Sequence, residues 1–174
     1  MPTTVIPFRG EGAKQRVPAE FRAELAGAML ADVLAAAEEI GPVLLAEGRG
    51  QGPSVEAALA DVRETPVLVV NADLPAVTPR DLLALVGSIP AEGIAVAAAA
   101  DGTTNALALA APSLFEPLYG PGSAERFLAL AASRLVEIPN LADDVDTLAD
   151  LERLEERLGP HTRAALESLR SAAR

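Results

Sequence analysis

The run Thr65-Pro-Val-Leu-Val-Val-Asn-Ala-Asp73 decides the fold predicted for this 174-residue chain. Its central residues are apolar and mostly β-branched, without the polar alternation of a strand that faces water on one side. Continuous runs of this kind are typical of strands buried on both faces in parallel sheets. The run ends in polar residues and Leu74-Pro75, so it predicts a central strand that delivers Asp73 to the edge of the sheet.

Strand and helix patterns alternate on both sides of this run. The predicted strands are Thr3 to Pro7, Pro42 to Ala46, Gly93 to Ala100, Thr104 to Ala110 and Leu135 to Ile138. The predicted helices are Ala19 to Ile40, a helix from about Ser54, a helix capped by Thr78 that ends near Val86, Ser123 to about Ser133, and a final region that follows Thr147 and is broken at Gly159-Pro160. The alternation favours an α/β fold, a three-layer α/β/α sandwich with a mostly parallel sheet. Residues 1–174 are expected to form a single domain, with residues 160–174 as a loosely docked tail.

Composition restricts the classes of function. The chain has no cysteine, which excludes disulfides, thiolate zinc sites and a cysteine nucleophile, and its single histidine, His161, is given no role. A formal net charge of −11 opposes attraction to nucleic acid. The longest apolar runs are far shorter than the roughly 20 residues of a membrane helix. We therefore predict a cytoplasmic protein without nucleic-acid or membrane partners, whose anionic substrates must meet a metal, a few basic side chains or helix N-termini.

A basic loop at residues 7–16 (PFRGEGAKQR) follows the first predicted strand. It places Arg9, Lys14 and Arg16 beside Gly10 and Gly12, and these are the ingredients of a phosphate-binding loop. The loop matches neither the Walker A sequence nor the dinucleotide fingerprint. A surface loop with solvated charges is the equally weighted alternative.

Acidic residues gather at two places in the chain. Asp73 ends the central strand, and Asp143-Asp144-Val145-Asp146-Thr147 precedes the last helical region. In an extended segment Asp144 and Asp146 point the same way. Carboxylates brought together repel unless a cation lies between them, and magnesium prefers such oxygen ligands. The alternatives are that Asp73 caps a turn and that the second run is a solvated loop with Asp146 or Thr147 capping a helix; for Asp143 we prefer the solvated reading.

A glycine-rich turn, Tyr119-Gly-Pro-Gly-Ser123, leads into a predicted helix, and Gly102-Thr-Thr-Asn105 precedes it along the chain. Backbone N–H groups at a helix start, with a serine hydroxyl, favour an anion. The turn is equally well read as an ordinary connector.

Taken in order, these motifs resemble one known family. They are Ala13-Lys-Gln-Arg16, Met29-Leu-Ala-Asp-Val-Leu34, Asp73-Leu-Pro75, Gly102-Thr-Thr-Asn-Ala-Leu107, Gly120-Pro-Gly-Ser123 and Asp144-Val-Asp-Thr147, and together they cover nearly the whole chain. The sequence resembles the 2-phospholactate or phosphoenolpyruvate guanylyltransferases of coenzyme F420 biosynthesis. That resemblance implies a nucleotidyltransferase fold similar to the enzymes that attach GMP to molybdopterin.

The resemblance also implies partners and site residues. GTP and magnesium would bind, with two magnesium ions held by Asp73, Asp144 and Asp146. The acceptor's phosphate and carboxylate would meet Thr104, Asn105, Gly120 and Ser123. The nucleotide would bind to Arg9, Gly10, Gly12, Lys14, Gly52 and Ser54, and the catalytic residues would be Lys14, Arg16 and Asp73. The predicted reaction is transfer of GMP from GTP to phosphoenolpyruvate or 2-phospho-L-lactate with release of pyrophosphate.

The chain departs from the family at two loops. It has Lys14-Gln-Arg-Val17 where Lys-Ser-Arg-Leu is usual, and the segment before Ser54 is abbreviated, with Val55-Glu56 in place of a Leu-Asn pair. Because this loop helps to hold the nucleotide, the identity of the base is left open. The choice between the two acceptors and the formation of a homo-oligomer are also left open. The alternatives are a molybdopterin-type guanylyltransferase, whose longer Leu-Ala-Gly-Gly loop is absent here, and a non-catalytic nucleotide-binding homologue.

Overall fold

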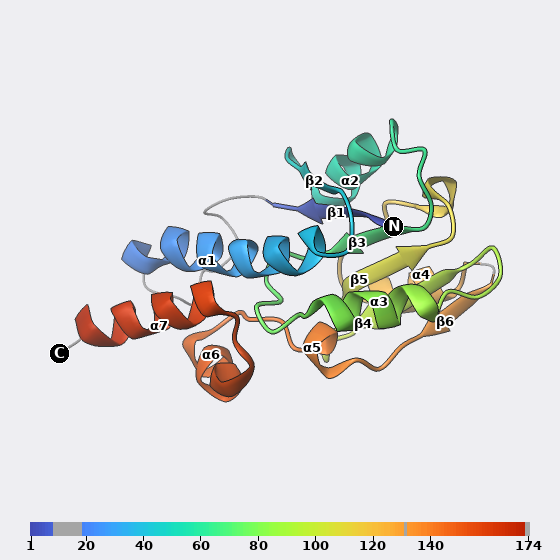
Figure 1. Cartoon of the computed structure of the whole chain (residues 1–174). Helices are drawn as coiled ribbons and strands as arrows, with labels where there is room; N and C mark the ends of the chain where they lie inside the picture. The colour runs from blue at the N-terminus through green and yellow to red at the C-terminus, as the bar shows by residue number, and fades with distance from the viewer. Residues whose placement is uncertain (9–18, 131, 173–174) are drawn as a thin grey trace.

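The computed structural model describes residues 1–8, 19–130 and 132–172, which form one six-stranded sheet covered by helices (Figure 1). The strands are β1 (Thr3–Pro7), β2 (Val43–Ala46), β3 (Val67–Val70), β4 (Ile94–Ala98), β5 (Thr104–Leu109) and β6 (Ser133–Leu135). The helices are α1 (Ala19–Glu38), α2 (Gln51–Leu59), α3 (Pro79–Gly87), α4 (Ser123–Leu128), α5 (Pro139–Ala142), α6 (Leu148–Leu154) and α7 (Pro160–Ala172), with short 3-10 turns η2 (Pro112–Leu114) and η3 (Glu155–Arg157).

The sheet has the strand order β2-β1-β3-β5-β4-β6, and β5 is the strand that runs against its neighbours. The other pairings, β1 with β2, β1 with β3 and β4 with β6, are parallel, so the predicted mostly parallel sheet is confirmed. Val70 at the end of β3 pairs with Ala106 near the start of β5. The reversal therefore brings Thr104 and Asn105 to the same edge of the sheet as the residues that follow β3.

Helices cover both faces of the sheet, which confirms the three layers. Leu68 and Val70 of β3 face a core shared with α1, α3 and α5. Val67 and Val69 of the same strand face a core shared with α2 and α4. Since successive residues of a strand point to opposite faces, this run is buried on both sides, as its composition predicts.

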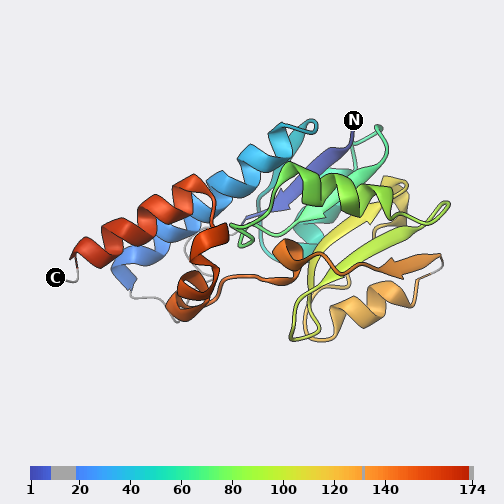
Figure 2. The same ribbon diagram turned by 60° about the horizontal axis from the view of Figure 1, so that its bottom comes forward.

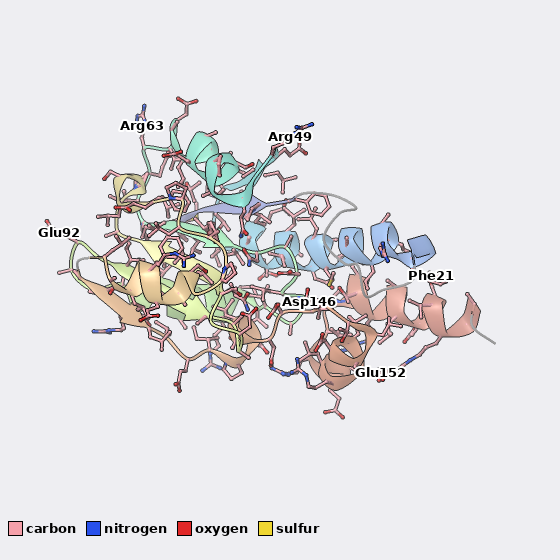
Figure 3. The ribbon with its side chains drawn as sticks, turned by 180° about the vertical axis from the view of Figure 1, so that it is seen from behind. Phe21, Arg49, Arg63, Glu92, Asp146 and Glu152 are labelled. Carbon is pink, nitrogen blue, oxygen red and sulfur yellow. The ribbon has the colours of Figure 1, made fainter. Side chains whose placement is uncertain are left out.

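A third apolar cluster lies beyond the sheet, where α1 meets α6 and α7 (Figure 2). Leu25 and Met29 of α1 pack with Leu154 and Leu166, and Phe21 packs against the same group (Figure 3). The loosely docked tail expected for residues 160–174 is therefore corrected over its described part, because α7 buries Leu166 in this cluster. Among the described residues, no helix combines the length and the apolar character needed to cross a membrane.

Local signals set most element ends. Thr78 caps α3 as predicted: its hydroxyl accepts from the N–H of Asp81, whose carboxylate accepts from the N–H of Thr78. Thr147 and Asp150 form the same reciprocal cap at α6. The prediction was less accurate after α4, which ends at Leu128 rather than near Ser133, so β6 begins at Ser133.

Candidate active site at the carboxyl end of β3

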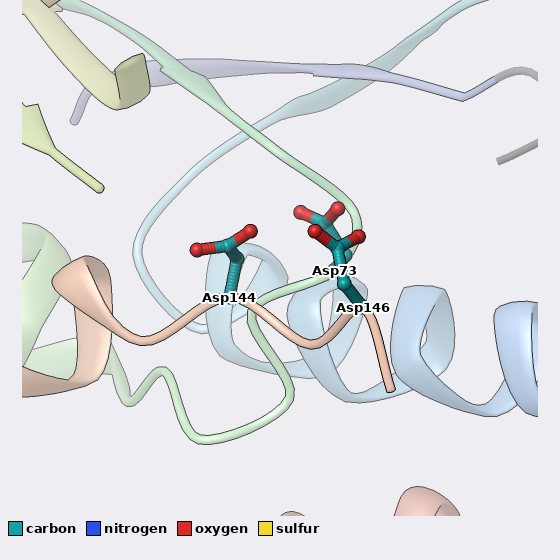
Figure 4. Close-up of side chains that lie close together, drawn as sticks. All are labelled: Asp73, Asp144 and Asp146. Carbon is teal, nitrogen blue, oxygen red and sulfur yellow. The ribbon is translucent and has the colours of Figure 1, made fainter. Parts of the chain in front are cut away.

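The carboxylates of Asp73, Asp144 and Asp146 meet at one edge of the sheet (Figure 4). One oxygen from each lies within 4.8 Å of those from the other two. Asp73 lies on the loop that follows β3, whereas Asp144 and Asp146 lie between α5 and α6. The backbone N–H of Val145 donates to the carbonyl of Asp73 at 3.0 Å, and its side chain is buried, so the acids on either side of it face Asp73. The predicted convergence of these carboxylates is confirmed.

This cluster is electrostatically unfavourable by itself. Burial, and then the neighbouring charge of Asp73, raise the pKa of Asp144, and Asp146 adds to the effect. The Asn105 side chain opposes it weakly, donating to Asp144 Oδ1 at 3.4 Å. Magnesium binds oxygen ligands at about 2.0–2.1 Å, so opposite ligands of one ion are about 4.2 Å apart. Carboxylate oxygens within 4.8 Å of one another therefore fit a divalent cation, which would also relieve their repulsion.

Asp143 is directed away from the cluster, but it is paired with two arginines and not solvated as the sequence interpretation had it. Its carboxylate accepts from Arg153 Nη1 at 2.8 Å and from Arg157 Nη2 at 2.5 Å. Burial acts to raise the pKa of Asp143, but the hydrogen bonds from these two guanidinium groups outweigh it and hold the pKa below the usual value. Asp143 thus anchors the segment before α6 and is not part of the cluster of Asp73, Asp144 and Asp146.

A polar strip adjoins the acidic cluster and includes residues predicted to bind the acceptor. Asn105 contacts Asp144, and the Ser123 hydroxyl donates to Thr104 Oγ1 at 3.0 Å. Thr104 and Asn105 are each 2% exposed, and Ser123 is 0% exposed. The Ser123 hydroxyl is therefore turned inward and ties α4 to the start of β5.

Gly120 belongs to the turn before α4, which is held in place by a side chain that the sequence interpretation missed. Gly120 (φ 114°) and Gly122 (φ 69°) adopt backbone angles that favour glycine. Arg126 donates to the carbonyls of Leu118 and Pro121. The carbonyl and the N–H of one trans peptide point in opposite directions, so the N–H groups of Tyr119 and Gly122 point away from Arg126. An arginine just after a glycine-rich turn was the available signal.

Gly52 and Ser54, predicted to bind the nucleotide, lie at the start of α2. Gly52 packs closely against a neighbouring segment, and Ser54 forms a hydrogen bond within the helix start. A Cβ at Gly52 would lie 2.7 Å from Cβ of Pro117, so the helix approaches that residue closely. The Ser54 hydroxyl donates to the carbonyl of Gly50 at 2.7 Å.

Two further polar residues connect this helix to the strand ends. Gln51 Nε2 donates to Asn71 Oδ1 at 2.7 Å, and Asn71 Nδ2 donates to the carbonyl of Thr104 at 3.1 Å. Neither residue was predicted as part of the site, although Asn71 directly follows the buried run of β3. The predicted Arg9, Gly10, Gly12, Lys14 and Arg16 lie outside the described residues.

Comparison with known proteins places the chain in a family. Residues 20–136 match the model of the MobA-like NTP transferase domain. The phosphoenolpyruvate guanylyltransferase of Conexibacter woesei is 34% identical, with 95% of each chain covered. The chain belongs to the MobA-like NTP transferase family. The resemblance to guanylyltransferases noted in the sequence is thereby confirmed.

The guanylyltransferase relatives from Sphaerobacter, Nocardia and Conexibacter are longer than this chain. The phosphoenolpyruvate guanylyltransferase of Sphaerobacter thermophilus is 45% identical over 94 residues, which is 51% of this chain and 45% of that protein. The chain spans about half the length of this relative and of the one from Nocardia farcinica, of which 54% is covered. The Conexibacter alignment runs over 211 positions, more than the 174 residues of the chain, so that relative carries segments that are missing here.

Solved structures show the same fold. A putative nucleotide-diphospho-sugar transferase from Desulfovibrio desulfuricans superposes with a TM-score of 0.72 at 14% identity, covering 98% of this chain and 95% of that one. The bifunctional IspDF from Campylobacter jejuni superposes with a TM-score of 0.61 at 11% identity, covering 88% of this chain and 54% of that one. The nucleotidyltransferase fold expected from the sequence is confirmed.

Proposed function

We propose that the chain transfers GMP from GTP to phosphoenolpyruvate or 2-phospho-L-lactate and releases pyrophosphate, as a step in coenzyme F420 biosynthesis. The observation that carries the proposal is the meeting of Asp73, Asp144 and Asp146 beside the polar strip of Thr104 and Asn105. The names of the family relatives support the guanylyl group and the phospho-acid acceptor. The cytoplasmic location expected from the sequence stays a prediction.

We assign magnesium to the acidic cluster, held by Asp73, Asp144 and Asp146, with two ions as the expected number. Bound there, magnesium would neutralise charge on the reacting phosphates. The donor set supports this assignment because all the side-chain ligands are carboxylate oxygens, which magnesium prefers.

The proposed bond changes occur between the two substrates, and the residues of the chain position them and stabilise their charge. An oxygen of the acceptor phosphate forms the new bond to the α-phosphorus of GTP, and the bond from that phosphorus to the pyrophosphate oxygen breaks. The acceptor phosphate is already ionised at neutral pH, so no general base is required. Catalysis then consists of positioning and charge stabilisation. Lys14 and Arg16 would offset the charge of the leaving pyrophosphate, and Arg9, Gly10 and Gly12 would contact the nucleotide phosphates.

The acceptor is assigned to the strip between β5 and α4. Asn105 would orient Asp144 from the acceptor side, and the turn at Gly120, held by Arg126, would offer N–H groups to an anion. Thr104 and Ser123 would hold that turn against β5, because their hydroxyls are hydrogen-bonded to each other in the interior. Gly52 and Ser54 would shape the nucleotide side at the start of α2.

The test is pyrophosphate release, with and without magnesium, from a panel of nucleoside triphosphates and both phospho-acids. We expect turnover with GTP and at least one acceptor. Asp73→Asn and Lys14→Ala should each lower turnover by about 10²-fold or more. Asp143→Asn is the matched control, because this neighbouring acid faces Arg153 and Arg157 instead of the cluster. Release with another nucleotide alone would redirect the proposal to a different nucleotidyltransferase, and binding of GTP without turnover would indicate a non-catalytic homologue.

A further inference from the structure

Asp32 is a buried carboxylate in the middle of α1 that the proposed reaction does not use. Its side chain is 2% exposed. It accepts hydrogen bonds from the backbone N–H groups of His161 at 3.0 Å and Thr162 at 2.8 Å, and it lies 2.9 Å from Nδ1 of His161. The first N–H groups of a helix have no partner within the helix. Asp32 therefore caps the start of α7 from a distant part of the chain.

The residue before α7 fits closely against this carboxylate. A Cβ at Gly159 would lie 2.3 Å from Cγ of Asp32, so a larger residue would push the two segments apart. The N–H of Gly159 donates to the carbonyl of Pro75 at 2.8 Å. Pro75 stands two residues after Asp73. A continuous series of contacts thus runs from Asp32 through Gly159 to the loop that carries Asp73.

The other acidic segment rests on the same group of helices. The side chain of Val145, between Asp144 and Asp146, is fully buried in the cluster formed by α1, α6 and α7. The N–H of Val145 donates to the carbonyl of Asp73. In Figure 3, Asp146 lies between the sheet and these C-terminal helices. Both acidic segments are therefore held by the helices that Asp32 joins.

We propose that Asp32 is a positioning residue for the acidic cluster: by fixing Gly159 and the start of α7 against α1, it holds the loop of Asp73 at the spacing that a divalent cation requires. The inference rests on the proposed function only in that the cluster binds such a cation. Asp32 itself lies outside the cluster and contacts backbone N–H groups and His161.

The experiment measures Mn²⁺ affinity by calorimetry in the absence of nucleotide, on the full chain at a temperature where every variant is folded by circular dichroism. Asp32→Ala removes all the acceptor oxygens, and Asp32→Asn keeps one of them. Gly159→Ala separates the same segments from the opposite side. Arg170→Ala is the matched control: Arg170 ties the far end of the same helix to Glu155 at 2.9 Å and touches none of the residues in the proposed series.

We expect Asp32→Ala and Gly159→Ala to weaken Mn²⁺ binding by about 10-fold, the lower end of the range for groups that orient metal ligands. Asp32→Asn should fall between these variants and the wild type, and it carries the test if Asp32→Ala does not fold. Arg170→Ala should bind as the wild type does. Wild-type affinity in the folded Asp32 variants would overturn the proposal, as would an equal loss in Arg170→Ala or a wild type that binds no Mn²⁺. A chain that binds Mn²⁺ in the expected order but releases no pyrophosphate would overturn the proposed function alone.

Discussion

The backbone N–H of Val145 donates a 3.0 Å hydrogen bond to the carbonyl oxygen of Asp73, and this bond joins the two acidic segments of the chain. Because the link is made by backbone atoms, a change of side chain at Asp144 alters the charge of the cluster without removing the link. Charge and geometry can therefore be tested separately.

Asp144→Asn should reduce the stabilisation that magnesium gives to the folded protein. In the wild type, magnesium at 100 times its dissociation constant is expected to add about 2.7 kcal/mol to the free energy of unfolding. Without metal the variant should be at least as stable as the wild type, since it removes a charge repelled by Asp73. Urea unfolding with and without magnesium chloride measures both effects. Asp143→Asn serves as the control and should keep the magnesium response; a full response in Asp144→Asn would remove Asp144 from the metal site.

The cap of α6 should weaken in acid. Burial acts to raise the pKa of Asp150, but hydrogen bonds from the side chain of Thr147 and the N–H groups of Asp146 and Thr147 outweigh it and hold the pKa below its ordinary value. A carboxyl whose pKa is lowered by folding stabilises the folded state fully above its unfolded value and loses that contribution as the pH falls through its folded value. The stability difference between wild type and Asp150→Asn should stay constant from neutral pH to about pH 5 and shrink below about pH 4. A difference that persists unchanged into strong acid would contradict this assignment.

Ser123→Ala should lower the free energy of unfolding by about 1–3 kcal/mol, because it leaves the buried Thr104 hydroxyl without its partner. The double variant Ser123→Ala/Thr104→Val lacks both hydroxyls. Its loss in the free energy of unfolding should be smaller than the sum of the losses in the two single variants. Urea unfolding of the four proteins in this cycle measures the coupling. Additive losses would show that the 3.0 Å contact contributes no interaction energy.

In the proposed reaction the same variants should raise the KM of the acceptor more than that of GTP.

Gly52→Ala should destabilise the fold by about 1–3 kcal/mol, since the added methyl group would lie 2.7 Å from Pro117. Gly27→Ala is the matched control, because Gly27 lies in α1 with no atom within 4 Å of the added Cβ. There the substitution should stabilise the protein by about 0.5–1 kcal/mol through helix propensity. Thermal unfolding of both variants gives the comparison, and equal effects would show that the approach of α2 to Pro117 is not tight.

The sequence predicted the central strand and its acid because that information is local. The apolar run of β3 must be buried on both faces, and Asp73 must then emerge at the end of the strand. The Thr78 cap was equally local. The direction of β5 could not be predicted, since a strand of that composition packs in either direction. Its reversal nevertheless brings Asn105 to the acidic cluster.

The contacts of Asp32 illustrate a second limit. It lies inside a motif that was recognised in the sequence, yet nothing local shows that its carboxylate binds backbone N–H groups of the C-terminal helix. Apart from the His161 ring, the partners are main-chain N–H groups, which carry no residue signature. Gly159 was likewise read only as a break in the last helical region, whereas in the structure it packs against Asp32.

The hydrogen bond between Val145 and Asp73 joins two segments that are synthesised at different times. Asp73 leaves the ribosome with the central strand, but its carboxylate partners follow much later, between α5 and α6. Gly159, which holds the loop after Asp73, emerges after them. All six strands therefore leave the ribosome before the acidic cluster is complete. A chain cut short before α7 would contain every acid of the cluster but lack the helix whose start Asp32 caps.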